Sequence, residues 1–382
     1  MKKNVLLFFI VFIIFSAGCK NKSYTKKKSD NGSLVENRIK KAPIKKLKLI
    51  KTLKTDRKKR YYYVHIFKDR LVGLEINDNK MYISALDHDL NLIKRSEYVE
   101  GKGPGEFLRM CALTYNNGKY FFVDGNKKTI EVFDEKFNYQ DTILLKSEVS
   151  SMYRSPSSII KTQNGYYFSP SIPYVLIKIN ENGKIGGFVK SEKSVETHPH
   201  RIWGWNYSII SSDENGNIYM TFPSRGKLYQ IRKYDKNLNL IWKNNIRDKY
   251  NDILNKRNIV KIDKSIQPEG PYKMIDIDVN GNNIYILRGV GGEQVWNKDK
   301  SEYHFEKISE IDTPFIDVFN KENGKFLHRI KVDFLNSKYV YKFKKINEKF
   351  LFFSNPYFKK NKHEKGSNNF IIAEISNEKK DS

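Results

Sequence analysis

The chain has 382 residues, of which 39% are hydrophobic and 14% are aromatic. That length suits two or three ordinary domains or one large repetitive domain, and that composition can fill a packed core, so general disorder is excluded. The 24 Tyr and 24 Phe favour half-buried β-sheet, and the presence of only 2 Cys excludes a disulfide scaffold.

The net charge of +27 is concentrated near the N-terminus. Residues 20–60 hold 17 Lys or Arg against three acids, a net +14, and Lys2 and Lys3 add +2, which leaves +11 for residues 61–382. Neither an arginine-led reading element nor a basic helix appears. We therefore expect no nucleic-acid partner.

Residues 1–18 are predicted to be a signal peptide. Lys2 and Lys3 precede an apolar run, Val5 to Phe15, whose eleven residues are too few to cross a hydrocarbon core of about 30 Å as a helix. The ending Ser16-Ala17-Gly18-Cys19 resembles a bacterial lipobox, which implies cleavage before Cys19 and acylation of its thiol. Ser16 stands where Leu is usual, so ordinary secretion is the alternative.

Residues 19–45 are predicted to form a lipidated, flexible, basic tether. Its lysines would be attracted to anionic headgroups beside the anchor, although a merely solvated linker would have the same composition. The residues after the cysteine, Lys20-Asn21-Lys22, are not acidic. This favours a position anchored to the outer membrane and facing the periplasm over display at the cell surface.

Turn signals that precede aromatic strands recur through the rest of the chain. With the turns marked at residues 69, 117, 164, 215, 280 and 347, the intervals are 48, 47, 51, 65 and 67 residues. Four of these turns are Asn-Gly, which favours type I′ hairpins with positive φ at both central residues. Apolar strands are expected directly after the turns, at 120–123, 166–168, 218–221, 284–287 and 350–353.

A second turn recurs later in each unit. Three copies share the pattern Asp-x-x-[Leu/Phe]-Asn-[apolar], beginning at Asp87, Asp134 and Asp235, and an Asn-Gly takes the same place in units three and five. Two turns per unit of about 50 residues predict four antiparallel strands, the content of a propeller blade. The fold expected for residues 46–378 is therefore all-β: a six-bladed β-propeller of four-stranded antiparallel blades, followed by a tail at 379–382.

Six blades must close into a ring, because open ends would expose strand edges. The last unit supplies only three candidate strands. We predict that the alternating segment Leu47 to Leu53 supplies the fourth. A β-sandwich would also contain many short strands, but it would not explain the repeated turns.

The stretch Gly101-Lys102-Gly103-Pro104-Gly105-Glu106-Phe107 lies at the junction between the first two units. It resembles a signature of six-bladed β-propeller lipoproteins of Gram-negative bacteria, which are similar to NHL-repeat and TolB-like propellers. The resemblance implies architecture and lipid anchoring rather than a reaction. The glycines allow a sharp turn between blades, so Gly101, Gly103, Pro104, Gly105, Glu106 and Phe107 are expected to form a structural inter-blade loop.

Motifs of metal, cofactor and enzyme sites are missing. The segment from Asp276 to Gly281 matches the opening of an EF-hand calcium loop, but Leu287 stands where a bidentate Glu is required, so we predict a strand and hairpin instead. The glycines at 101, 103 and 105 do not make a dinucleotide fingerprint. We expect no cofactor, no metal and no catalytic residue, and Cys111 is expected to be a small buried thiol.

An unusual cluster, His198, His200, Arg201, Trp203 and Trp205, links the third and fourth units. On one face of a propeller its aromatic rings could stack on a sugar or peptide, while His and Arg bond polar groups. These five residues are the candidate ligand-binding site, with packing between blades as the alternative. The segment 289–296 is expected to be a surface loop.

The favoured function is a binding or scaffold module for a glycan, a peptide or an envelope protein, formed by a monomeric propeller held at the membrane by an N-terminal lipid. The alternative is a propeller-type lyase or hydrolase with a site at the channel mouth. A third possibility is a structural component of an envelope complex. Acid-base chemistry would require His or carboxylate side chains from different blades within hydrogen-bond reach of one another.

Overall fold

The structure of the protein is a computed structural model. It describes residues 33–39, 43–56, 59–78, 80–146, 158–170, 174–190, 208–221, 229–248, 272–290, 293–297, 302–306, 314–335, 340–354 and 369–376. The chain divides between residues 31 and 32, and all of these residues belong to the unit 32–382. Within the described ranges there are 27 strands and no helix, so the expected all-β class is confirmed.

The strands of residues 59–248 form four sheets in which consecutive strands pair antiparallel. The first sheet contains β3 (Lys59–Ile66), β4 (Leu71–Asn77), β5 (Lys80–Leu86) and β6 (Leu92–Glu97). The second contains β7 (Met110–Asn116), β8 (Lys119–Asp124), β9 (Thr129–Asp134) and β10 (Tyr139–Leu144). The third contains β11 (Ile159–Thr162), β12 (Gly165–Phe168), β13 (Tyr174–Ile179) and β14 (Ile185–Lys190). The fourth contains β15 (Ile209–Ser212), β16 (Ile218–Thr221), β17 (Tyr229–Tyr234) and β18 (Leu240–Asp248).

The remaining long sheet has eight strands in the order β19-β20-β23-β24-β2-β27-β26-β25. One half consists of β19 (Tyr272–Asn280), β20 (Asn283–Val290), β23 (Phe315–Asn320) and β24 (Phe326–Lys331). The other half consists of β25 (Val340–Ile346), β26 (Lys349–Ser354), β27 (Asn369–Ile375) and β2 (Ile44–Lys54). The strands that the sequence predicted after the turns lie in β8, β12, β16, β20 and β26.

Strand β2 joins the two halves because its two ends have different partners. Residues Ile44 to Lys46 pair in parallel with β24, whereas Leu47 to Lys54 pair antiparallel with β27. The predicted pairing of the segment 47–53 with the last strands of the chain is therefore confirmed. It gives the β25-β26-β27 meander a fourth strand from far upstream in the sequence.

A further strand, β1 (Ser33–Ile39), pairs in parallel with β18 and widens the fourth sheet to five strands. Strand β1 and the beginning of β2 both lie within residues 19–45, the range predicted to be a flexible tether. Polar composition had suggested a linker there, but backbone pairing to an existing sheet edge needs no apolar core of its own. Only residues 20–32 separate Cys19 from the first strand.

Among the described residues there are six hydrophobic clusters. Five of them draw buried side chains from two sheets, and the sixth lies between the two halves of the eight-stranded sheet. Strand β8 is apolar at almost every position because both of its faces are covered. Tyr120 and Phe122 pack toward the first sheet, while Phe121 and Val123 pack toward the third. Side chains alternate across a strand, so a sheet covered on both faces needs apolar residues at every position.

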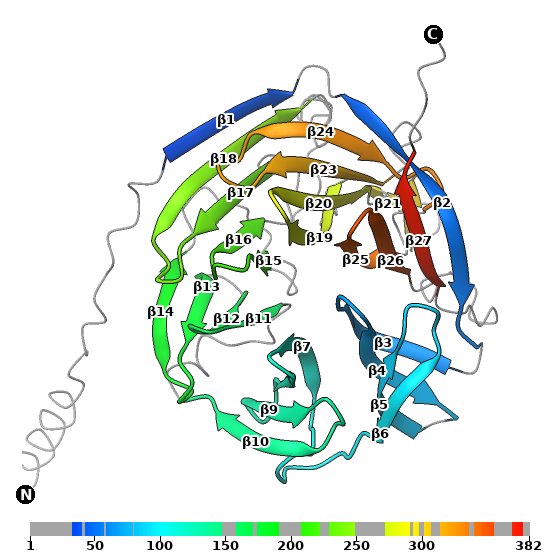
Figure 1. The fold of residues 1–382 in the computed structure, drawn as a ribbon, viewed down its shortest axis with the longest axis vertical. Helices are drawn as coiled ribbons and strands as arrows, with labels where there is room; N and C mark the ends of the chain where they lie inside the picture. The colour runs from blue at the N-terminus through cyan, green and yellow to red at the C-terminus, as the bar shows by residue number, and fades with distance from the viewer. Residues whose placement is uncertain are drawn as a thin grey trace, which may run out of the picture. The chain divides into compact units, whose positions relative to one another are not determined.

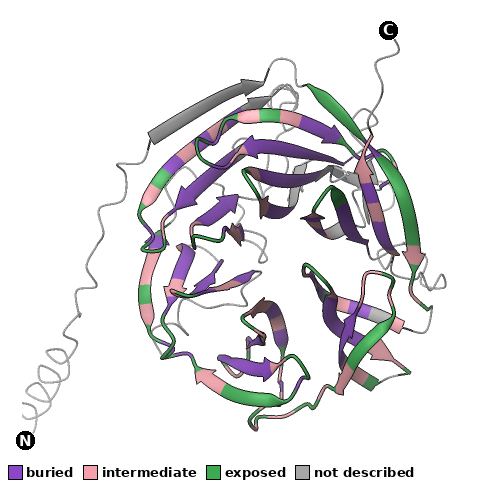
Figure 2. Cartoon of the chain, in the orientation of Figure 1, coloured by how far each residue is buried: buried purple, intermediate pink, exposed green. Residues whose placement is uncertain are grey.

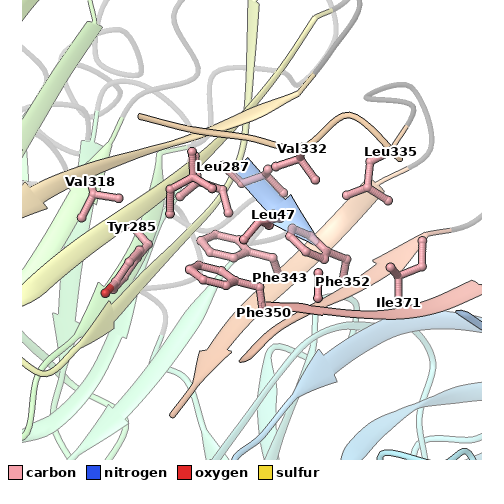
Figure 3. Close-up of a cluster of buried hydrophobic side chains, with 13 residues drawn as sticks. Leu47, Tyr285, Leu287, Val318, Val332, Leu335, Phe343, Phe350, Phe352 and Ile371 are labelled. Carbon is pink, nitrogen blue, oxygen red and sulfur yellow. The ribbon is translucent and has the colours of Figure 1, made fainter. Parts of the chain in front are cut away.

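Figure 3 shows the cluster between the two halves of the eight-stranded sheet. Leu47 of β2 lies among Phe343, Phe350 and Phe352, and it is 8% exposed. Tyr285 enters the same cluster from β20. The strand borrowed from upstream therefore contributes to the core as well as to backbone pairing.

The first strands of successive sheets are neighbours in space. Contacts join β3 to β7, β7 to β11, β11 to β15, β15 to β19, β19 to β25, and β25 back to β3. Within residues 32–382 the sheets follow one another around a common centre, with these strands innermost (Figure 1). Successive antiparallel sheets around one centre, packed face to face, define a β-propeller.

The repeated Asp turn has one geometry in its three copies. Asp134 accepts hydrogen bonds from the backbone N–H of Lys136 and of Asn138, each at 2.8 Å, and from the Asn138 side chain. Phe137 adopts a left-handed backbone with φ of 60° and is 4% exposed. The apolar fourth residue is therefore retained because burial of its side chain offsets the cost of positive φ.

The prediction of type I′ turns is correct only at Asn117-Gly118, where both residues have positive φ. At the other Asn-Gly pairs the positive φ belongs to the glycine, as in Gly165, Gly216 and Gly281. At Gly216 the reason is a longer turn, in which Asp213 accepts hydrogen bonds from Asn215 and Asn217. The prediction of type I′ at those sites was wrong.

The expectation of a surface loop at 289–296 was also wrong. Gly289 and Val290 belong to β20, and β21 (Glu293–Asn297) pairs with β22 (Glu302–Glu306) as a separate hairpin. This hairpin lies in the chain between β20 and β23, and it accounts for part of the longer interval in the fifth unit. The glycines of this segment suggested a loop, but most of its described residues belong to strands.

Candidate functional site

A β-bulge interrupts the innermost strand β3. The register shifts between Tyr62 and His65, so Tyr63 and Val64 together stand opposite Gly73. Tyr63 has φ of 50° and is 46% exposed, whereas Val64 is 6% exposed. A left-handed backbone is an outlier for a bulky residue, and bulges often turn a side chain away from the pleat. The bulge thus leaves an aromatic ring exposed on an inner strand.

Two carboxylates of β19 bind the inner edge of β25. Asp276 Oδ1 lies 3.2 Å from Lys342 Nζ, and Asp276 Oδ2 accepts a hydrogen bond from the Phe343 N–H at 3.1 Å. Asp278 Oδ1 lies 2.6 Å from Lys344 Nζ, and its Oδ2 accepts from the Lys345 N–H at 2.9 Å. Among the described strands β25 pairs only with β26, so these carboxylates supply acceptors for N–H groups on its other edge.

We call Tyr63, His65, Asp276, Asp278, Lys342 and Lys344 the inner cluster. These six residues lie on β19, β25 and β3, three innermost strands in which β25 contacts both β19 and β3. The prediction that Asp276 to Gly281 forms a strand and hairpin is confirmed, since Asp276 and Asp278 lie within β19.

The charges of the inner cluster shift three pKa values. Burial raises the pKa of Asp276, although Lys342 and the Phe343 N–H oppose that rise. Burial by itself would lower the pKa of Lys344, but the adjacent Asp278 outweighs it and the pKa is raised. Burial, together with the positive charges of Lys342 and Lys344, holds the pKa of His65 well below its usual value. His65 is therefore neutral at pH 7.

The inner cluster is better suited to binding than to proton transfer. Each carboxylate already accepts from an ammonium group and from a backbone N–H, so neither is poised as a base toward a ligand. Among the described residues, no group of three His, Cys, Asp or Glu could hold a metal ion. Tyr63 adds an exposed aromatic residue on an innermost strand, and such a ring can stack on a polar ligand.

The predicted binding residues His198, His200, Arg201, Trp203 and Trp205 lie outside the described residues, as does Cys19. Cys111 lies on β7 and is half-buried, with its thiol 3.4 Å from the Val123 carbonyl oxygen.

The segment 101–107 connects β6 to β7 and is held by side chains. Glu106 accepts a hydrogen bond from the Gly103 N–H at 2.6 Å, and Lys127 Nζ donates to the carbonyls of Gly103 and Glu106, each at 2.8 Å. The Gly105 N–H donates to Glu131, which pairs with Lys127 at 2.7 Å. These contacts attach the connection to the second sheet.

Two glycines in this segment have no room for a side chain. A Cβ on Gly101 would lie 2.1 Å from the Glu106 carboxylate, and Gly105 has φ of 73° with the Tyr139 ring 3.0 Å from the position of a Cβ. Phe107 is buried and stacks on Tyr98 with ring centroids 5.1 Å apart. Burial raises the pKa of the Tyr98 phenol, and the negative charges of Asp124 and Glu100 add to that rise.

Sequence reasoning missed the inner cluster as a unit. In the sequence, Asp276 and Asp278 stand out only as part of an incomplete calcium-binding motif. Nothing in the sequence links them to Lys342 and Lys344. About 66 residues separate the two pairs, so pairing could not be inferred without the contact between β19 and β25.

Comparisons with known proteins show similarity in fold. No family model matches the chain, and comparison with curated proteins gives no match. A member of the DUF4221 family from Bacteroides vulgatus aligns over 87% of this chain and 98% of its own, with 12% identity and a TM-score of 0.57. A protein of Bacteroides fragilis described as exported aligns over 90% of this chain and 100% of its own, with 11% identity and a TM-score of 0.51.

The WD40 β-propeller domain of Doa1 aligns over 87% of this chain with 11% identity and a TM-score of 0.38. At such identities the two Bacteroides structures show the fold alone. Within the part of the chain that is described, no helix has the length and apolar character needed to span a membrane.

Proposed function

We propose that the chain is a lipid-anchored, six-bladed propeller of the cell envelope that acts as a binding or scaffold module for a glycan, peptide or protein partner. Cys19 would carry the lipid, on the outer membrane and facing the periplasm. The leader and the lipobox-like ending support this location, and so does the fold similarity to a protein described as exported.

The count of six blades is supported by the packing. Five hydrophobic clusters of the described residues each join two sheets, a sixth joins the two halves of the eight-stranded sheet, and the contacts of the innermost strands return from β25 to β3. In this proposal the eight-stranded sheet is two blades joined by β2, which pairs with β24 over three residues before it turns to β27. The segment 101–107 would then be the connection between the first two blades.

Binding at the centre is supported above all by Tyr63. Its ring is 46% exposed and its backbone is left-handed, on an innermost strand next to the lysine-rich β25. Strained backbone at an exposed aromatic residue is common where a site holds a ligand. The residues His198 to Trp205 remain a second candidate surface of the same module.

Affinity capture from envelope extracts tests the proposal. The mature protein is compared with Tyr63→Ala, with the pair Trp203→Ala/Trp205→Ala, and with Ile93→Ala as a control, since Ile93 is 51% exposed on the outer strand β6. We expect Tyr63→Ala or the tryptophan pair to lose a partner that the wild type and the control recover. Equal recovery by all four proteins would overturn the proposed binding site.

A further inference from the structure

Strand β2 has a composition unlike that of the other outer strands. It carries five lysines at positions 45, 46, 48, 51 and 54 and no acid, a net +5. The strands β6, β10, β14, β18 and β24 carry net charges between −1 and +2. Among these outer strands the positive charge is thus greatest on β2.

The same strand exposes aliphatic side chains. Nine of its eleven residues are exposed, and Ile44, Leu49 and Ile50 are 64%, 43% and 43% exposed. A register shift between Leu49 and Lys51 leaves Ile50 as the extra residue of a bulge, outside the pairing with β27. In Figure 2 the outer strand β2 is coloured mostly as exposed.

Protection against edge-to-edge pairing would explain the lysines, because charged residues commonly blunt sheet edges. It does not explain the aliphatic residues, which make an exposed edge more prone to association. Lysines that alternate with exposed aliphatic side chains suit a surface whose outer layer is anionic and whose next layer is apolar. The interface of an anionic bilayer has that character.

Nearby acids only partly offset the charge. Lys51 pairs with Asp89 at 2.7 Å, with both side chains exposed, and Glu374 of β27 stands opposite Lys48 in the register. Exposed pairs of this kind are weak and easily exchanged for other partners. The strand keeps a positive excess after both are counted.

The position of β2 in the chain also supports an anionic bilayer as its partner. Residues 20–32, thirteen in all, connect Cys19 to β1, and β1 pairs with the outer strand β18 shortly before β2 begins. Thirteen residues span at most about 45 Å when fully extended. An anchor at Cys19 would therefore hold β1 within about 45 Å of the membrane, a distance that allows β2 to reach it.

We propose that β2, through its lysines and through Ile44, Leu49 and Ile50, is a membrane-docking edge that lies on anionic lipid headgroups. The inference assumes the proposed envelope location, but it does not require acylation of Cys19. It orients the propeller with the edge of β2 against the bilayer and leaves the inner cluster free for a partner.

Vesicle co-sedimentation tests the proposal on the chain from Lys20, which retains the whole unit 32–382. The vesicles are phosphatidylcholine alone or phosphatidylcholine mixed with phosphatidylglycerol. We expect binding only to the mixed vesicles, weakening with added salt. A lysine near a charged surface is worth about fivefold in partitioning, so Lys45→Gln/Lys48→Gln/Lys54→Gln should bind roughly ten- to a hundredfold more weakly.

Matched control variants remove exposed lysines or exposed aliphatic side chains from the first two sheets instead of from β2. Lys80→Gln/Lys94→Gln/Lys119→Gln changes three exposed lysines of the first two sheets and should retain binding. Leu49→Ser/Ile50→Ser should weaken binding severalfold, while Leu92→Ser/Ile93→Ser, which changes residues 49% and 51% exposed on β6, should not. Circular dichroism shows whether each variant is folded.

Several results would overturn the proposal. Equal losses in the β2 variants and their controls would show a non-specific effect of charge. Loss of heparin binding without loss of vesicle binding would assign β2 to a soluble polyanion, and a concentration-dependent dimer abolished by the same variants would assign it to a second copy. Because partner capture by Tyr63 is measured separately, failure here would leave the proposed binding function standing.

Discussion

The ammonium group of Lys344 lies 2.6 Å from the carboxylate of Asp278, and this ion pair joins β25 to β19, the two end strands of the eight-stranded sheet. Asp278 is 1% exposed and also accepts the Lys345 N–H. One buried carboxylate thus satisfies a side chain and a backbone group of the other half of the sheet. The innermost strands are held together by polar contacts as well as by the hydrophobic clusters behind them.

Asp278→Ala should destabilise the fold because it removes both contacts from a buried position. We expect the free energy of unfolding to fall by about 3 kcal/mol, and by less for Asp278→Asn, which keeps an acceptor for the N–H. Denaturant titration measures the change. Glu181→Ala is the control: its pair with Lys161 is also 2.6 Å long, but Glu181 is 61% exposed, so the loss should stay below about 1 kcal/mol. Similar losses at the two sites would contradict the structural role of Asp278.

The contribution of β2 to the core can be measured with two leucines of the same strand. Leu47 is 8% exposed in the cluster of Figure 3, whereas Leu49 is 43% exposed. Leu47→Ala should lower the free energy of unfolding by about 2 to 4 kcal/mol through lost burial and a residual cavity, and Leu49→Ala by less than about 1 kcal/mol. Equal effects in urea titrations would mean that β2 does not close the last sheet as the pairing indicates.

Local chemistry explains how much of this fold the sequence could predict. Turn residues and apolar runs act over a few positions, so the strands in β8, β12, β16, β20 and β26 were predictable. The pairing of 47–53 was inferred from a missing strand. The pairing of β1 with β18 depends on a sheet edge more than 200 residues away, and the polar sequence before residue 45 gave no sign of it.

The candidate site was less predictable for the same reason. Bringing Asp278 to Lys344 requires the contact between β19 and β25, and exposing Tyr63 requires the bulge in β3. A bulge is set by competition between the two faces of a sheet, which a single strand's sequence does not determine. The tryptophan and histidine cluster at 198–205 is still a prediction.

Alanine substitutions at three glycines that share the same φ can distinguish the stability cost of backbone strain from the cost of steric crowding. Gly105, Gly118 and Gly183 all have φ of 73°, but a Cβ would meet nothing within 4 Å at Gly118, the Tyr139 ring at 3.0 Å at Gly105, and the Leu144 carbonyl oxygen at 2.0 Å at Gly183. Gly118→Ala should cost about 1 kcal/mol from the left-handed backbone alone, Gly105→Ala more, and Gly183→Ala more than about 3 kcal/mol. Thermal and denaturant unfolding give the order, and a different order would contradict the packing around the connection at 101–107.

His328 of β24 should make the fold less stable in mild acid. Burial, together with the charge of Lys45, lowers the pKa of His328 from 6.5 to about 4. The unfolded chain therefore binds more protons between pH 6.5 and 4, so stability is full above pH 6.5 and is lost as the pH falls through this window. His328→Gln should lose less stability between pH 7.5 and pH 4.5 than the wild type does, as measured by urea unfolding at each pH. Parallel pH profiles for the two proteins would show that His328 does not titrate in this way.

Substitution of Tyr63 should abolish partner binding while leaving the stability of the fold nearly unchanged. Glycine accepts φ of 50° without strain, so Tyr63→Gly should change the free energy of unfolding by less than about 1 kcal/mol, relief of strain offsetting the greater freedom of the unfolded chain. Tyr62→Gly, one residue earlier, removes a ring that packs on the cluster between the first two sheets and should cost more than about 2 kcal/mol. In envelope capture, Tyr63→Gly should lose the partner although it remains as stable as the wild type. If Tyr63→Gly were strongly destabilised, the ring would be serving the fold, and if it kept the partner, the strained residue would have no part in recognition.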